Sequence, residues 1–195
     1  MFDNPQMNEM ANASPRRRVL MVGPYPPPFG GLGNNMSLLL GSDLARRYEL
    51  TLLRTSKHVK HVRVSMPDIW SGPYLVLNAF RMVGMMLRHR PDLVYVKATS
   101  DTGFVRDTTM MAIARLFGRP VVCHLHGRPM GRLFALQGFW TRLVARAMRL
   151  ATVTIVLSPG LKTIFAGMFP GQRLVVLPNV VDVYDVILAE DGSPA

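Results

Sequence analysis

The chain has 195 residues, and 49% of them are apolar, which is enough to build the core of one large domain. Its formal net charge of +11 favours an anionic partner, such as nucleotide phosphates, an anionic membrane surface or nucleic acid, although an arginine-rich, solvated surface would give the same charge. The single cysteine excludes an internal disulfide and suits a reducing compartment, and no apolar run reaches the roughly 20 residues of a membrane-spanning helix.

The two ends of the chain differ in composition from its middle. Residues 1–15 are polar and lack the apolar stretch of a signal peptide. We therefore expect a disordered tail there, on a cytoplasmic protein that is soluble or peripheral at the inner face of the membrane. Residues 186–195 are expected to form a second disordered tail, which leaves a single domain over residues 16–185.

Short apolar runs alternate with longer segments of helical periodicity along this domain. Strands are predicted at 19–23, 48–53, 92–96, 120–124, 152–157 and 174–177. Helices are predicted at 35–47, 72–90, 105–117 and 133–150, with a further short helix that Ser158 caps and that ends near 167. This alternation predicts an α/β fold, a single Rossmann-like domain with a mostly parallel sheet and helices on both faces.

Residues 24–33 form the first segment that suggests chemistry. A proline-rich stretch follows the first strand and ends in Gly30, Gly31 and Gly33, just before a helix. Glycine allows a phosphate or a sugar to approach the backbone closely, and the first amides of a helix favour a negative group. The pattern is neither the G-x-G-x-x-G of dinucleotide-binding proteins nor a P-loop. It predicts a ligand-binding loop, with a purely structural turn as the alternative.

Polar residues also follow the third predicted strand. The segment from Lys97 to Asp101 would lie at the carboxyl edge of the sheet and line the same crevice, unless it is an ordinary loop. Earlier in the chain, His58 and His61 lie in a basic connection. Its lysines would repel a metal ion, so a solvated loop or one that meets an anionic surface is the preferred interpretation.

The fourth predicted strand ends in a histidine-rich segment. Alternation along a strand places His124 and His126 on the same side of the sheet. His126 comes at the carboxyl end and is followed by Gly127 and Arg128, so we interpret it as a ligand-contacting residue and His124 as a packing or supporting one. A metal site would need a third ligand, which the segment lacks. Cys123 is interpreted as a buried, inert thiol.

The segment between Asp107 and Asp182 contains no acidic residue. Within it, the predicted helix 133–150 carries Arg142, Arg146 and Arg149 at helical spacing, on one face. Such a face could rest on an anionic membrane surface or could simply be the solvated side of a core helix.

Four segments, taken in order, resemble the N-terminal half of a family-four, GT-B-fold glycosyltransferase. They are the first strand with its proline-rich loop and Gly30-Gly31, the strand Pro91–Val96, the strand Val121–Gly127, and the pair Val156–Ser158 and Val175–Asp182. The resemblance extends over about residues 17–183.

The resemblance implies two Rossmann-like domains that face each other across a cleft, the N-terminal one holding a sugar or lipid-linked acceptor and the C-terminal one the nucleotide-sugar donor. It implies transfer with retention of configuration, with neither a metal nor a cofactor. It further implies that His126 is the catalytic residue that contacts the donor sugar or the reacting oxygen. The contacts that it implies are Gly30 and Gly31 with the donor diphosphate or the acceptor, and Lys97 and Arg128 with the acceptor. Gly33 and Asp101 are further candidates for substrate or donor binding because of their places in the two loops.

The sequence departs from the family pattern in several places. Family members are about twice as long, and the second domain should bring the basic pair for the diphosphate and an E-x7-E motif. Val180 replaces a common glycine, and Tyr95 replaces a common histidine. We therefore expect a fragment, or half of a split enzyme, that needs a missing C-terminal domain or partner half and is inactive alone. The alternative is a non-catalytic basic module that binds an anionic membrane surface or a partner protein. No recognised motif supports nucleic-acid binding.

Overall fold

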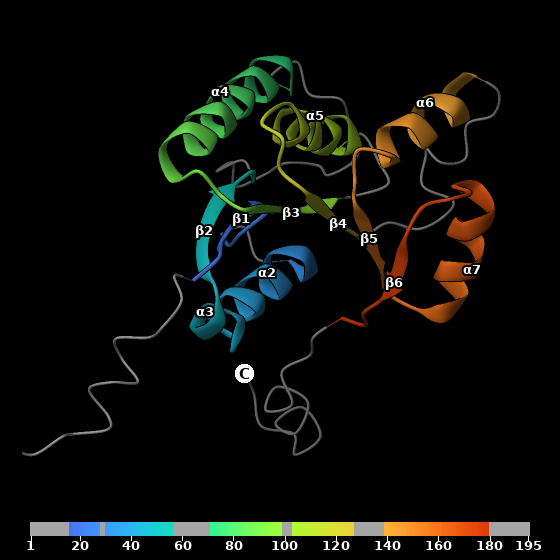
Figure 1. Cartoon of the computed structure of the whole chain (residues 1–195), viewed down its shortest axis with the longest axis horizontal. Helices are drawn as coiled ribbons and strands as arrows, with labels where there is room; N and C mark the ends of the chain where they lie inside the picture. Colours follow the sequence, from blue (N-terminus) through green and yellow to red (C-terminus); the bar gives the residue numbers. More distant parts are fainter. Residues whose placement is uncertain (1–15, 28–29, 57–70, 99–102, 127–138, 180–195) are drawn as a thin grey trace, which may run out of the picture.

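A computed structural model describes residues 16–27, 30–56, 71–98, 103–126 and 139–179. Its centre is one six-stranded sheet in which every pairing is parallel, with the order β2-β1-β3-β4-β5-β6 (Figure 1). The strands are β1 (Arg18–Gly23), β2 (Glu49–Arg54), β3 (Leu93–Ala98), β4 (Val121–Leu125), β5 (Val153–Val156) and β6 (Leu174–Val176). The predicted Rossmann-like α/β fold is therefore confirmed.

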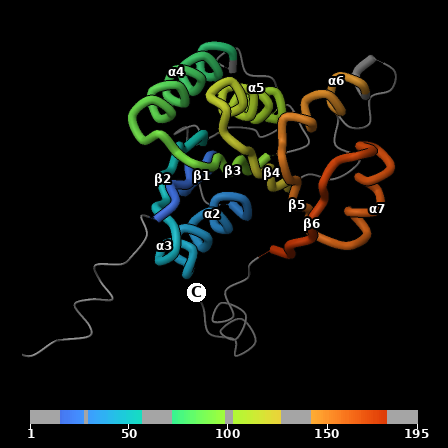
Figure 2. Tube along the Cα trace, in the orientation of Figure 1, coloured from blue at the N-terminus to red at the C-terminus, as the bar shows by residue number. Residues whose placement is uncertain are grey.

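The helices lie on both faces of this sheet, as predicted. They are α2 (Gly31–Gly41), α3 (Leu44–Arg47), α4 (Ser71–His89), α5 (Gly103–Leu116), α6 (Phe139–Met148) and α7 (Pro159–Met168). Helices α2 and α3 cover one face, and α4, α5 and α6 cover the other (Figure 1). This division follows from topology, because the chain moves outward from β1 to β2 and then returns past β1 to β3, and right-handed crossovers in opposite directions place their helices on opposite faces. In the tube view, α7 lies beside β6 at the far end of the sheet (Figure 2).

The central strands are apolar on both sides because both faces of the sheet are covered. In β1, Val19 and Met21 pack in the core under α2, whereas Leu20 and Val22 belong to the larger core under α4 and α5. A strand that is buried on two faces is a continuous apolar run rather than an alternating one. This is why the first strand was evident in the sequence.

The predicted helix 35–47 is wrong in its extent. The structure has α2 from Gly31 to Gly41 and a separate short α3, with Ser42 and Asp43 between them. The Ser42 hydroxyl donates to the Leu39 carbonyl oxygen at 2.7 Å, the kind of local side-chain bond that competes with a helix. As a result Leu44, expected on the apolar side of one helix, is 39% exposed.

The remaining elements agree with the prediction to within a few residues wherever the structure describes them. Ser158 caps α7 as expected, since its hydroxyl accepts a hydrogen bond from the Leu161 amide at 3.2 Å. Only residues 139–148 of the predicted helix 133–150 form a described helix. The predicted tails 1–15 and 186–195 lie outside the described residues. In the part of the chain that is described, every helix is too short or too polar to cross a bilayer.

Candidate functional site

The carboxyl edge of the sheet has a switch point between β1 and β3. The loop after β1 leads to α2 on one face, and the segment after β3 leads to α5 on the other (Figure 1). Ligands of open α/β sheets bind at such points. Here the two strands are packed unusually tightly, because a Cβ atom added to Gly23 would lie 2.9 Å from the Cβ of Lys97 and 2.6 Å from the Cε of Met36. Gly23, to which sequence analysis gave no role, therefore allows α2 to approach the end of β3.

Lys97 is a buried cation at this switch point. It is 1% exposed, and its Nζ donates to the Oδ1 of Asn35 on α2. Burial lowers the pKa of Lys97 to about 7. An ammonium has three donors, and among the described residues no carboxylate pairs with it.

Two histidines lie beside Lys97. His124 is paired with Lys97 in the β3–β4 register, and the ring centroids of His124 and His126 are 4.1 Å apart. Burial and the neighbouring Lys97 lower the pKa of His124 to about 4, and burial, His124 and Lys97 lower that of His126 to about 3. Both imidazoles are therefore neutral near pH 7. The prediction that the two side chains share one side of the sheet agrees with their contact.

A tyrosine defines how His124 is protonated. The Tyr95 hydroxyl is hydrogen-bonded to Nδ1 of His124, and burial raises the pKa of Tyr95. The hydroxyl therefore stays protonated and donates, so the proton of the neutral His124 ring lies on Nε2.

Three buried nitrogen atoms in this cluster have no hydrogen-bond partner among the described residues. They are Nε2 of His124, Nε2 of His126 and Nδ2 of Asn35. Buried polar groups are normally hydrogen-bonded, so such atoms suggest contact with a group that is not part of these segments. Together with the Lys97 ammonium, they suit an anionic group or one rich in hydroxyls. We call Asn35, Lys97, His124 and His126 the edge cluster.

The structure places the predicted site residues as follows. Lys97 and His126 lie together in the edge cluster. Gly30 and Gly31 are exposed at the start of α2, with open space where a Cβ would be. Gly33 is instead buried, and an added Cβ would lie 3.2 Å from Cδ of Pro26, so its evident role is in packing. Asp101 and Arg128, like His58 and His61, lie outside the described residues. Ligand contact by any of these residues stays a prediction.

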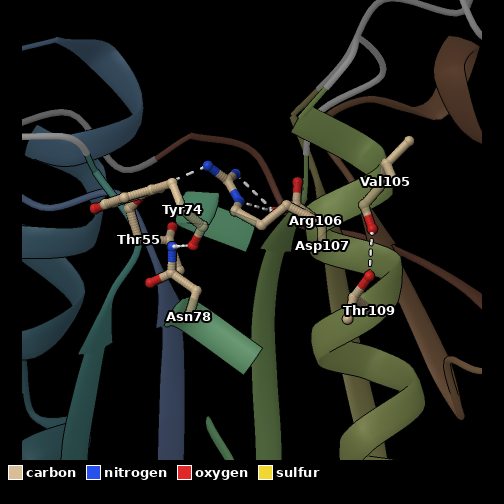
Figure 3. Close-up of polar contacts among 7 residues, drawn as sticks. All are labelled: Thr55, Tyr74, Asn78, Val105, Arg106, Asp107 and Thr109. Atoms are coloured by element: carbon tan, nitrogen blue, oxygen red, sulfur yellow. Dashed lines mark hydrogen bonds and ion pairs between the residues drawn. The ribbon is translucent and has the colours of Figure 1, made fainter. Parts of the chain in front are cut away.

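Residues of α4 and α5 form polar contacts with the segment that follows β2, next to the carboxyl edge of the sheet (Figure 3). The Arg106 guanidinium forms a 2.7 Å ion pair with the buried Asp107 and donates to the Thr55 carbonyl oxygen at 3.4 Å. The Thr55 amide in turn donates to the Gly23 carbonyl oxygen at 2.9 Å. The Tyr74 hydroxyl donates to the neighbouring carbonyl oxygen of residue 56 at 2.7 Å. Sequence analysis missed this support, although an acidic residue within the apolar pattern of a helix was the available signal.

The described residues offer no alternative site of comparable chemistry. No three His, Cys, Asp or Glu side chains in the described ranges are placed to hold a metal ion. An open hollow of about 590 Å³ lies near the start of β2, beyond the opposite edge of the sheet, and exposed Arg16 and Glu49 supply its charges. It contains no buried polar atom that lacks a partner.

The edge cluster should make the protein acid-labile. His124 and His126 titrate near 4 and 3 when folded but near 6.5 when unfolded, so below pH 6.5 the unfolded chain binds more protons and the free energy of unfolding falls. Each histidine contributes a slope of up to about 1.4 kcal/mol per pH unit. Urea denaturation between pH 7 and pH 4 should show this slope, reduced in His126→Gln and unchanged in the control His89→Gln on α4. Equal slopes in all three proteins would contradict the assignment.

Comparisons with known proteins add to this geometry. The model of Glycosyltransferase Family 4 matches residues 31–184. MurG of Acinetobacter baumannii is 14% identical with a TM-score of 0.48, over 82% of this chain and 44% of that one. The structure of S. aureus MnaA with UDP is 12% identical with a TM-score of 0.54, over 84% of this chain and 44% of that one, which supports the fold alone. No curated protein matches. This chain thus spans less than half the length of either structure, and it belongs to Glycosyltransferase Family 4, as an N-terminal domain of the GT-B type.

Proposed function

We propose that this chain is the acceptor-binding lobe of a glycosyltransferase that moves a sugar from a nucleotide-sugar donor to a sugar or lipid-linked acceptor. The observation that carries the proposal is the edge cluster at the switch point of the sheet. It contains a buried ammonium and three nitrogen atoms that have no partner among the described residues. Membership of Glycosyltransferase Family 4 supplies the reaction class. The MnaA structure carries a nucleotide, UDP, on a similar fold.

Lys97 and Asn35 would bind a phosphate of the donor or of a lipid-linked acceptor. An anion beside Lys97 favours the charged ammonium and raises its pKa from about 7, so binding should take up a proton near neutral pH. Binding should therefore tighten as the pH falls toward 7. Gly30 and Gly31, with no side chain to obstruct approach, would lie against the same ligand.

His126 would act as a hydrogen-bonding residue. With a pKa of about 3 in the ligand-free protein, it carries no proton to give as an imidazolium and is a weak base. Its neutral ring would instead bond to a hydroxyl of the donor sugar or to the reacting oxygen, and His124 would hold its orientation by ring contact. In this proposal the transfer retains anomeric configuration and uses no metal.

A second lobe would complete the enzyme. Stabilisation of the charge on a leaving group is usually the largest catalytic contribution, and we place its main cationic donors on a C-terminal domain or a partner half. The chain spans 44% of the MnaA structure, which agrees with one lobe of two. We therefore expect the chain alone to bind ligand weakly and to transfer no sugar.

Saturation-transfer NMR with pyrophosphate and with UDP-, GDP- and ADP-sugars tests this proposal. Wild-type protein should bind at least one of these probes, and His126→Ala should weaken binding of a nucleotide-sugar about fivefold, as expected for one lost hydrogen bond between neutral groups. The matched control His89→Ala should bind as the wild type does. No sugar should be transferred until a second Rossmann-like domain with E-x7-E is supplied. Normal turnover by this chain alone, or undiminished binding by His126→Ala, would refute the proposal.

A further inference from the structure

The outer side of α4 is apolar although it faces away from the sheet. Its exposed apolar residues are Val76 (54% exposed), Leu77 (44%), Phe80 (72%) and Leu87 (62%), which we call the α4 stripe. At 3.6 residues per turn, Val76, Phe80 and Leu87 fall within about 40° of one another around the helix. The opposite side of α4 packs into the core through Met82 and Met86. The helix therefore has two apolar sides, and the described chain buries only one.

The neighbouring helix extends this surface. Helix α5 packs beside α4 on the same face of the sheet (Figure 1). It exposes Val105 (55%) and Leu116 (85%). Both helices leave the carboxyl edge and return to the amino edge, so Leu116 and Leu87 lie near corresponding ends of the two helices. The exposed apolar surface thus extends over two neighbouring helices rather than over α4 alone.

The charged side chains that the described helices α4, α5 and α6 expose all have one sign. Arg81 and Arg88 lie along one border of the α4 stripe, and Arg115 is exposed on α5. Helices α4 and α6 contain no acidic residue, and the single acid of α5, Asp107, is buried in its ion pair with Arg106. Helix α6, on the same face, adds exposed arginines at 142 and 146, with a third just beyond its end at 149.

The other face of the sheet has a different surface. Around α3, exposed Asp43 and Glu49 accompany Arg46 and Arg47, and Asp43 pairs with Arg46 at 3.5 Å. Its bases, which include Arg16, are interspersed with acids, and among the described residues it lacks a stripe of strongly exposed apolar side chains. The asymmetry between the two faces is therefore one of charge and of apolar exposure together.

We propose that the α4 stripe, with the arginines beside it, docks this protein on an anionic lipid bilayer. Apolar side chains of a surface helix insert into the boundary between headgroups and acyl chains, while adjacent basic residues bind anionic headgroups. Helix α4, which contains no acidic residue, combines Phe80 and Leu87 with Arg81 and Arg88 and so has both parts. The inference is independent of glycosyl transfer, because lipid binding requires no turnover.

Vesicle co-sedimentation tests the docking with matched pairs of variants. Vesicles of phosphatidylcholine with about one-third phosphatidylglycerol should bind the wild type, and high salt or pure phosphatidylcholine should release it. Arg81→Gln/Arg88→Gln should weaken binding about 25-fold, and Phe80→Ser/Leu87→Ser about 20-fold or more. The controls on the opposite face, Arg46→Gln/Arg47→Gln and Leu44→Ser, should change it less than about twofold.

Several outcomes would overturn this inference. One is equal binding of the wild type to neutral and anionic vesicles. Another is a loss of vesicle binding in the α3 control variants that is as large as the loss in the α4 variants. Circular dichroism of each variant shows whether weaker binding results from unfolding or from the loss of the binding side chains. All substituted side chains are exposed, so the variants should remain folded. If vesicles fail to bind while Phe80→Ser/Leu87→Ser abolishes self-association in ultracentrifugation, the stripe is an interface with a second copy, and the lipid proposal is wrong.

Discussion

Replacing Lys97 with methionine should make the protein more stable and abolish its binding of anions. The wild-type ammonium is 1% exposed and has one described partner, Asn35, so folding must desolvate or deprotonate it. Methionine has a similar length and no charge. We expect a gain of about 1–3 kcal/mol in the free energy of unfolding at pH 7, after allowing for the Asn35 oxygen that loses its donor.

The pH dependence of this gain provides a second readout. Because the pKa of Lys97 is about 7 when folded and 10.5 when unfolded, the unfolded wild type binds more protons above pH 7, and its stability rises with pH. Burial also raises the pKa of Cys123, whose unfolded value is 9.0, so above about pH 9 this thiol opposes the Lys97 contribution and the rise should level off. Between pH 7 and pH 9 the rise should be present in the wild type and absent in Lys97→Met, as urea denaturation can measure.

The same variant tests whether the edge cluster is a binding site. Pyrophosphate binding, followed by calorimetry, should become undetectable in Lys97→Met. The matched control is Lys162→Met, which removes an exposed lysine on α7 and should change neither stability nor binding appreciably. A higher stability together with lost binding is the signature of a residue retained for function. Lower stability, or unchanged binding, would show that Lys97 is a structural residue.

Replacing Asp107 with alanine should cause a larger loss of stability, about 3–5 kcal/mol, because it leaves Arg106 without its partner in a mostly buried site. Typical domains have a total stability of about 5–15 kcal/mol, so this loss is a large fraction. The matched control is Asp43→Ala, whose ion pair with Arg46 is exposed and should contribute less than about 1 kcal/mol.

The consequences of Asp107→Ala should reach the end of β1, next to the edge cluster. Arg106 donates to the carbonyl oxygen of Thr55, whose amide bonds to Gly23 at the end of β1. Amide hydrogen exchange should therefore accelerate at Thr55 in this variant, and the double variant Arg106→Met/Asp107→Leu should recover part of the lost stability. A loss below about 1 kcal/mol, with unchanged exchange at Thr55, would contradict the supporting role of this pair.

The success of sequence analysis differed between strands and helices for a physical reason. The strands β1 and β3 are buried on two faces, so they are continuous apolar runs that no helix pattern resembles. The helix at 35–47 carried apolar residues at helical spacing across Ser42 and Asp43, and periodicity alone did not indicate the break. Its cause is a local hydrogen bond from Ser42 to Leu39, which competes with the next helical turn.

The candidate site was predicted in its location but not in its composition. Lys97 and His126 were singled out because polar residues at the carboxyl end of a parallel strand face the crevice. Asn35 and Gly23 were missed because their roles depend on contacts across 62 residues and on the approach of α2 to β3. Asp107 was visible in the sequence as an acid within an apolar pattern, but the sequence did not show that it is buried in an ion pair with Arg106.

The local pattern of the chain determined the α/β class, the order of its elements and the edge of the sheet that carries polar residues, because these depend on periodicity and on short-range chemistry. Only the tertiary structure decided that Lys97 is buried beside Asn35, that the two histidines are neutral and in contact, and that the second apolar side of α4 faces outward. Burial, pKa and surface exposure depend on which distant segments pack together, and one-dimensional spacing does not specify that packing.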